Sequence, residues 1–172
     1  MKSQSTERSR VLVLTESALL TAAVYIATTL LKVPVPVTQG YIHLGDGLIL
    51  LGAGILGWPA VAAAAIGSAL ADLLGGYTLY VLPTLLIKAA VAATAVLFLS
   101  PGRPRFFPWL GYLVSELIMV AGYFLAEWIF LGYGLAGALS AVPANLVQGL
   151  SGVIIAAALS TPLQKAMKAA RL

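Results

Sequence analysis

The sequence predicts an all-α integral membrane protein in which six transmembrane helices form one compact bundle. Of its 172 residues, 60% are hydrophobic and 9% are charged, and the mean hydropathy is +0.99. About a quarter of the residues of a soluble domain are charged. A chain of this length needs nearly all its residues to build such a bundle, so we expect a single membrane domain over 1–172 and no separate soluble domain.

Six apolar runs are candidate spans, because a membrane helix needs roughly 20 apolar residues to cross about 30 Å of hydrocarbon. They cover residues 11–31, 44–57, 59–74, 78–99, 109–131 and 142–163. The second run is short and reaches only about 21 Å at a helical rise of about 1.5 Å per residue. Pro59, after Gly57 and Trp58, suits the first position of a helix. The second and third runs therefore form either two spans or one broken hairpin.

The basic residues predict the orientation. Eight of the ten lie before the first span, between the fourth and fifth, or after the sixth: Lys2, Arg8, Arg10, Arg103, Arg105, Lys165, Lys168 and Arg171. With six spans these three groups share one face, and basic residues collect on the cytoplasmic side. We therefore expect a cytoplasmic N-terminal segment (1–10), loop (100–108) and tail (164–172). The first apolar run is too long for a cleaved signal peptide and lacks a small-x-small site.

This orientation places residues 32–45 outside the membrane. The stretch KVPVPVTQG alternates valine with proline, which favours extended backbone, and GYIHLGDG follows it. The loop is either a lid over the mouth of the bundle or an ordinary connector. Asp46 is suited to cap the next helix, where its carboxylate would accept backbone N–H groups.

Ionisable residues inside apolar runs predict a binding pocket, because charges in a bilayer are costly and face the bundle interior. Following the direction of each span, most of these polar groups fall in the outer half, with Lys88 beneath them. The expected substrate-binding residues are Tyr41, His43, Asp72, Tyr77, Tyr80, Lys88, Tyr123, Glu127, Asn145 and Gln148. The competing interpretation is a set of buried pairs, such as Lys88 with Asp72 or Glu127, that fix helix packing.

Two acidic residues fall toward the predicted cytoplasmic side. Glu16 and Glu116 lie there, where snorkelling or a partner contact is expected rather than substrate binding.

Small residues recur at helical spacing. Ala18 stacks with Ala22, and Ala23 with Ala27, on roughly opposite sides of the first span. Such faces let helices approach closely, and they serve either internal packing or a contact with another protein. The third span carries a further set, Ala63, Gly67 and Ala71.

Several chemistries are excluded by what the sequence lacks. It has no cysteine and one histidine, so thiolate chemistry and histidine-rich metal sites are excluded. It contains no phosphate-binding loop, no H-E-x-x-H and no G-x-S-x-G motif. We therefore expect no enzyme, no metal and no cofactor in this chain, and ATP chemistry would have to come from a partner.

A family resemblance follows from these motifs. The stretch YIHLGDGLILLGAGILGWPAVAAAAIGSALADLLGGY, the following PTLLIKAA and the alanine pairs of the first span resemble the substrate-binding S components of energy-coupling factor (ECF) vitamin transporters. The resemblance covers nearly the whole chain and is most specific from Tyr41 to Lys88. It is weak in the last two spans.

The resemblance implies a vitamin binder of the prokaryotic plasma membrane, with its site at the outer side under the first loop. It also implies a transmembrane coupling subunit and two cytosolic ATPases as partners. The coupling subunit would contact Ala18 with Ala22, or Ala23 with Ala27. The motifs look closest to S components assigned to hydroxymethylpyrimidine, pyridoxine-like compounds or, by family label, riboflavin.

Ligand chemistry and competing functions also follow from the polar residues. The predicted pocket contains three carboxylates, one lysine and several tyrosines. This combination disfavours a phosphate ester as the ligand and suits a small neutral or weakly basic heteroaromatic ring. One alternative is a proton-coupled secondary transporter that uses Asp72 and Glu127 as a relay. Another is an intramembrane enzyme that uses them as acid and base, and a third is a purely structural subunit.

Overall fold

Six α-helices and one short strand hairpin make up the computed structural model, which describes residues 2–35, 37–99 and 107–170. In chain order the elements are α1 (Lys2–Leu30), β1 (Val33–Val35), β2 (Gly40–Ile42), α2 (Gly45–Leu56), α3 (Pro59–Leu74), the 3-10 turn η1 (Thr78–Tyr80), α4 (Val81–Leu99), α5 (Phe107–Leu125), the π-helical turn η2 (Ala126–Phe130) and α6 (Gly134–Ala170). The chain is therefore mostly helical, as expected. The predicted cytoplasmic loop 100–108 and the end of the tail lie largely outside the described residues.

Four helical segments of the described chain are long and apolar enough to cross a membrane, and they cover residues 10–30, 78–99, 108–130 and 134–166. The other two helices, α2 and α3, have 12 and 16 residues. They meet at Gly57, whose φ of 66° lies in the region that glycine adopts without strain. Pro59 begins α3, as its fixed φ favours.

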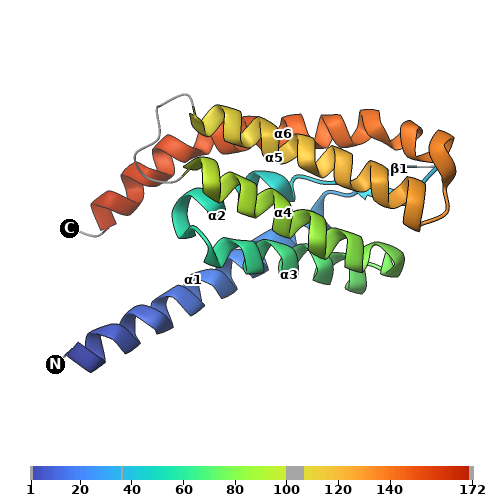
Figure 1. Cartoon of the computed structure of the whole chain (residues 1–172). Coiled ribbons are helices and arrows are strands. Elements are labelled where there is room, and N and C mark those ends of the chain that lie inside the picture. The colour runs from blue at the N-terminus through green and yellow to red at the C-terminus, as the bar shows by residue number, and fades with distance from the viewer. Residues whose placement is uncertain (1, 36, 100–106, 171–172) are drawn as a thin grey trace.

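The helices form a bundle in which α4 packs between α3 and α5, while α6 packs on α5 and α2. α1 packs on α3 and α2, and its N-terminal part projects beyond the other helices (Figure 1). Both chain ends lie at one end of the bundle, and β1 lies toward the other.

The last helix begins earlier than predicted. α6 starts at Gly134 rather than at residue 142, and Pro143 lies inside it. The residues before this proline, LAGALSAV, are small or apolar and continue the helix. A proline inside a helix removes one backbone hydrogen bond, which membrane helices tolerate.

The loop between α1 and α2 contains an antiparallel hairpin that the sequence analysis did not predict. The expectation of extended backbone was correct, but the extended segment is paired: Val33 lies opposite Ile42, and Val35 opposite Gly40. Gln39, in the turn, has a φ of 54°. The hairpin therefore gives the loop a fixed shape above the bundle.

Small residues bring α1 and α3 into close contact. Ala63, Gly67 and Ala71 are buried on one face of α3. A Cβ atom added at Gly67 would lie 2.6 Å from the backbone oxygen of Thr21 on α1. This set serves internal packing, because any larger side chain at Gly67 would push the two helices apart.

One buried ion pair joins three helices. Nζ of Lys88 on α4 lies 2.5 Å from Oδ1 of Asp46 on α2, and both side chains have an exposed fraction of 0%. The amide of Gln148 on α6 donates to the other carboxylate oxygen, Asp46 Oδ2, at 2.7 Å. Two charges removed from water need this kind of mutual compensation. The pair therefore fixes α2, α4 and α6 relative to one another.

The predicted capping role of Asp46 is wrong. The N-cap position of α2 is Leu44, without a side-chain cap hydrogen bond, and Asp46 lies in the first helical turn. Its carboxylate points toward Lys88 because an ammonium compensates its charge better than backbone N–H groups can. The competing interpretation paired Lys88 with Asp72 or Glu127, whereas the partner of Lys88 in the structure is Asp46.

We predict that Lys88→Ala destabilises the protein by about 3–5 kcal/mol, because it leaves the buried carboxylate of Asp46 without its counter-charge. Thermal unfolding in detergent measures the loss. The matched control is Lys165→Ala, at an exposed position near the end of α6, which should unfold like the wild type. The double variant Asp46→Asn/Lys88→Met should recover much of the loss. Equal melting of Lys88→Ala and wild type would contradict this role.

Candidate functional site

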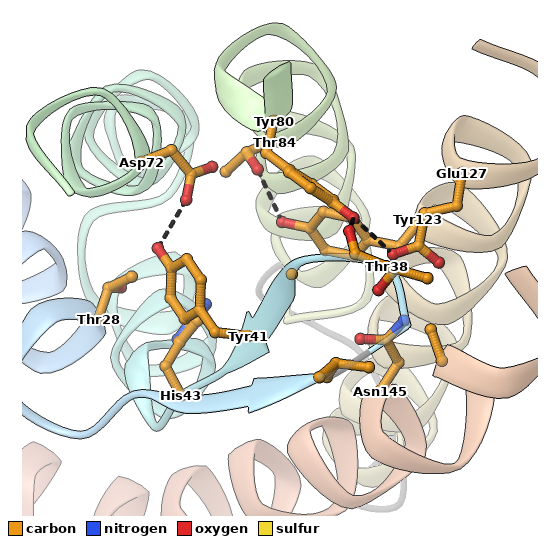
Figure 2. A pocket seen from close by; sticks show the side chains of 13 residues that line it. Thr28, Thr38, Tyr41, His43, Asp72, Tyr80, Thr84, Tyr123, Glu127 and Asn145 are labelled. Carbon is orange, nitrogen blue, oxygen red and sulfur yellow. Dashed lines mark hydrogen bonds between the residues drawn. The ribbon is translucent and has the colours of Figure 1, made fainter. Parts of the chain in front are cut away.

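A cavity lies between the hairpin and the helices beneath it (Figure 2). Its walls come from α1, the hairpin segment, α3, η1, α4, α5, η2 and α6. The lining residues are Thr28, Val35, Thr38, Gly40, Tyr41, His43, Asp72, Tyr80, Thr84, Tyr123, Glu127, Ala141 and Asn145. The cavity is thus lined by aromatic rings, hydroxyl groups, one amide and two carboxyl groups.

Tyr41 fastens one strand of the hairpin to α3. Its hydroxyl donates to Oδ1 of Asp72 at 2.6 Å, and its ring lies 4.4 Å from that of Tyr77, measured between centroids. Nζ of Lys32 lies 4.4 Å from the Tyr41 ring centre and 4.9 Å from that of Tyr77, within the range of cation–π attraction. Burial raises the pKa of Tyr41, and the neighbouring Asp72 raises it further, so the hydroxyl keeps its proton.

Tyr80 fastens the turn of the hairpin to the opposite side of the bundle. Its hydroxyl donates to the backbone oxygen of Thr38 at 2.6 Å and also lies 3.0 Å from Oε1 of Glu127. Close by, the hydroxyls of Thr84 and Tyr123 are hydrogen-bonded at 3.0 Å. The side chain of Tyr80, which belongs to η1, therefore connects the turn of the hairpin to η2.

The end of the hairpin segment is tied to the buried ion pair. The backbone N–H of His43 donates to Oε1 of Gln148 at 2.9 Å, while the amide nitrogen of Gln148 donates to Asp46. The imidazole Nδ1 of His43 accepts the N–H of Gly45 at 3.0 Å, so the ring carries its proton on Nε2 when it is neutral. This chain of contacts connects the floor of the cavity to Lys88.

The cavity is nearly closed. Its volume is about 20 Å³, which holds about one water molecule. A second hollow, of about 340 Å³, is lined by Gln39, Gly76, Tyr77, Thr78, Leu79, Tyr80 and Tyr133. Tyr80 lines both spaces and separates them. A ring-sized ligand therefore enters the inner cavity only when the hairpin or Tyr80 moves.

Comparison with known proteins identifies the family. The sequence model described as "ECF-type riboflavin transporter, S component" matches residues 9–165. The chain belongs to the S-component family of ECF transporters. This is a family of multi-pass membrane transport subunits and not a class of enzymes.

Individual relatives agree with this assignment. The thiamine precursor transporter HmpT of Lactococcus lactis subsp. cremoris is 32% identical over 161 residues, which cover 88% of this chain and 87% of HmpT. An uncharacterised protein from the gap 3' region of Pyrococcus woesei is 36% identical over 146 residues, 83% of this chain and 95% of that protein. The solved S component of a bacterial ECF transporter superposes with a TM-score of 0.76 at 19% identity, covering 92% of this chain and 99% of that one.

The structure of this S component gathers most of the predicted site residues. Seven line the cavity: Tyr41, His43, Asp72, Tyr80, Tyr123, Glu127 and Asn145. The other three lie outside its lining. The ring of Tyr77 packs against that of Tyr41 at an angle of 51° and lines the second hollow, while Lys88 and Gln148 lie with Asp46 in the network underneath.

The sequence analysis missed three threonines and misplaced one glutamate. Thr28, Thr38 and Thr84 line the cavity, but threonines are common in membrane helices and only their polarity marks them. Glu116 does not snorkel and is not available to a partner, because only 4% of it is exposed. Cβ atoms added at Gly149 and Gly152 of α6 would lie 3.4 Å and 3.3 Å from its two carboxyl oxygens. Those glycines make room for the carboxyl group inside the bundle.

We predict that His43 makes the stability of this S component depend on pH. His43 lies in the loop between β2 and α2, and burial lowers the pKa of its imidazole to about 3, against an ordinary value of 6.5. The unfolded chain therefore binds a proton that the folded chain does not. The neutral His43 makes its full contribution to the free energy of unfolding above about pH 6.5. This free energy then falls by up to about 1.4 kcal/mol per pH unit as the pH is lowered toward 3.

The variant His43→Asn tests this dependence, because its amide oxygen can accept the N–H of Gly45 and does not titrate. When the pH is lowered from about 7.5 to about 5, the melting temperature of the wild type should fall further than that of the variant. An equal fall in both proteins would exclude His43 as the source.

Proposed function

We propose that this S component captures a small heteroaromatic vitamin or vitamin precursor from outside the cell, such as hydroxymethylpyrimidine, a pyridoxine-like compound or a related ring. Import is then driven by ATP hydrolysis in partner subunits, namely a transmembrane coupling subunit and two cytosolic ATPases. This chain supplies the ligand site and no cofactor of its own. The observation that carries the proposal is the cavity beneath the hairpin, which joins aromatic walls to a few convergent polar groups.

The orientation proposed is six spans in a prokaryotic plasma membrane with both termini in the cytoplasm. Eight of the ten basic residues belong to the segments expected there. Both chain ends lie at one end of the bundle, away from β1 (Figure 1). In this orientation the hairpin over residues 33–42 faces the outside and serves as the lid of the cavity.

The walls of the cavity favour an uncharged or weakly basic ring. Tyr41, Tyr80 and Tyr123 offer aromatic faces for stacking. Lys88 is bound to Asp46 and is fully buried below the cavity, so it is not free to bind a phosphate. The relative HmpT, a thiamine precursor transporter, supports a ligand of this size and kind.

The coupling subunit is proposed to bind the face of α1 that carries Ala18 and Ala22. Both are exposed, whereas Ala23 and Ala27 are partly buried on the helix that packs against α3 and α2. Of the two alanine pairs, Ala18 and Ala22 therefore present the open small-residue surface that a partner helix can approach closely.

The first prediction from this proposal is that the detergent-purified chain retains one small heteroaromatic ligand at near one-to-one stoichiometry. Native mass spectrometry of the protein, alone and mixed with pyrimidine, pyridine, flavin, thiamine, biotin and pantothenate compounds, measures the retention. Asp72→Asn and Tyr123→Phe should weaken it, since both residues line the cavity. Folded protein that binds none of the panel, or unchanged affinity in both variants, would contradict the proposed site. Uptake that collapses with the proton gradient and needs no ATPase would favour the secondary transporter.

The second prediction concerns the partner. Ala18→Leu/Ala22→Leu should abolish co-purification with the coupling subunit, because the leucines hold the helices apart, and should leave ligand binding unchanged. Ala121→Leu, at an exposed alanine of α5, is the matched control and should co-purify normally. Normal co-purification of the double variant would show that the coupling subunit does not bind the face with Ala18 and Ala22.

A further inference from the structure

One buried acid of the bundle belongs neither to the cavity lining nor to the ion pair. Glu116 lies on α5, and its side chain is almost completely buried, yet neither of its two carboxyl oxygens makes a hydrogen bond within the described chain. Buried polar atoms in folded proteins are almost always hydrogen-bonded, so each exception calls for a reason. An acid with both oxygens unpartnered inside an apolar bundle needs one in particular.

A groove on the surface of the bundle reaches this acid. α5 and α6 pack side by side (Figure 1), and a hollow of about 170 Å³ lies between them. Glu116 is part of its lining, and the other lining residues are leucines, valines and a glycine. The leucines are exposed on the two helices: Leu113, Leu117, Leu146 and Leu150. Both helices are long and apolar enough to cross a membrane, so in the proposed arrangement the groove opens to lipid tails.

The charged neighbours of Glu116 leave it without a counter-charge. Those that interact with it within the described chain are Asp46 from α2 and Lys88 from α4, and the ammonium of Lys88 already lies 2.5 Å from the carboxylate of Asp46. A Cβ atom added at Gly152 of α6 would lie 3.0 Å from Cβ of Asp46 and 3.3 Å from Oε1 of Glu116. The two acids therefore approach the same glycine.

Two carboxylates with one ammonium would leave one negative charge uncompensated in this part of the bundle. An isolated charge in apolar surroundings is costly, and a buried acid avoids the cost when it stays neutral. A neutral Glu116 does not compete with Asp46 for Lys88. The proton on one acid thus preserves the ion pair of the other.

From the groove, the unpartnered oxygens and the charge count, we propose that Glu116 is a proton-binding site that is open to the lipid. Its carboxyl group is a neutral acid in the folded protein and is a modification site for apolar carbodiimides. The site lies outside the lining of the cavity beneath the hairpin. It depends on the proposed membrane arrangement and not on the ligand.

A carbodiimide reacts with the neutral acid, which makes it a probe of this proton. The carboxyl proton moves to one nitrogen of the reagent while a carboxyl oxygen bonds to its central carbon, and one C=N double bond becomes a single bond. The acyl group then migrates from that oxygen to the other nitrogen and leaves a stable N-acylurea. No atom is lost and nothing is oxidised or reduced, so the modified peptide gains the mass of one reagent molecule.

The test uses the purified full chain in phosphatidylcholine vesicles. One sample is treated with dicyclohexylcarbodiimide, and another with a water-soluble carbodiimide and an amine that traps its adduct. Proteolysis and peptide mass spectrometry then locate the modified acid. We expect at least about tenfold more label at Glu116 from the apolar reagent, because this reagent concentrates in the bilayer.

The pH dependence of the labelling rate reports the proton itself. From about pH 6 to about pH 8 the neutral fraction of an ordinary carboxyl group falls about a hundredfold. The rate at Glu116 should stay within about twofold over this range, because the neutral acid is its resting form. A fatty acid in the same vesicles shows that the reagent is active at each pH.

Three variants locate the proton. Glu116→Gln replaces the neutral acid by a neutral amide of the same shape, so it should lose the label and melt like the wild type. Asp46→Asn should reduce the label, because Glu116 is then the acid left to compensate Lys88 and gives up its proton. The matched control Asp46→Asn/Lys88→Met removes the ammonium as well and should regain the label.

The wild type alone decides the proposal, so the result does not depend on whether a variant folds. No label at Glu116, equal label from both reagents, or a hundredfold fall in rate from about pH 6 to about pH 8 overturns it. An unchanged label in folded Asp46→Asn overturns the argument from charge. Each of these measurements is made without a vitamin, so they leave the test of the ligand cavity separate.

Discussion

The pair between Asp46 and Lys88 is the constraint on which the rest of the structure depends. Each group alone would be an uncompensated charge in an apolar bundle, so the two must meet. Their contact brings α2 against α4, and the amide of Gln148 adds α6. Replacing such a pair by apolar residues can be neutral for stability, so its value here lies in fixing one arrangement of helices.

This arrangement also determines where the hairpin lies. Gln148 uses its amide nitrogen for Asp46 and its oxygen for the backbone of His43, so the base of the hairpin is positioned by the same residue that completes the ion pair. Tyr41 and Tyr80 then fasten the hairpin to α3 on one side and to η2 on the other. The cavity beneath the hairpin is thereby connected to the centre of the bundle through the two hydrogen bonds of Gln148.

The sequence revealed the site better than it revealed the contacts within the site. Asp72 and Glu127 could be predicted because an acid in an apolar run is costly and therefore faces the interior. The partner of Asp46 could not, since a capping role is suggested by neighbouring residues whereas Lys88 is 42 residues away. The hairpin was missed for a similar reason: alternating valine and proline predict extended backbone, but strand pairing requires Gly40 and Ile42 to return beside them. Local patterns thus predicted the elements and their polar residues, while pairing across the bundle depended on the tertiary fold.

The separation between Asp46 and Lys88 along the chain also imposes an order on biosynthesis. A chain is made from its N-terminus, so α2 emerges when the ammonium that Asp46 needs has not yet been synthesised. In the six-span arrangement, the short helix α2 acquires a stable place in the bilayer only when α4 follows it, 42 residues later. We therefore expect α2, α3 and α4 to enter the membrane as one cooperative unit. The backbone of His43 gains its hydrogen bond to Gln148 only after α6 has been inserted, so the base of the hairpin is the last part of this network to be fixed.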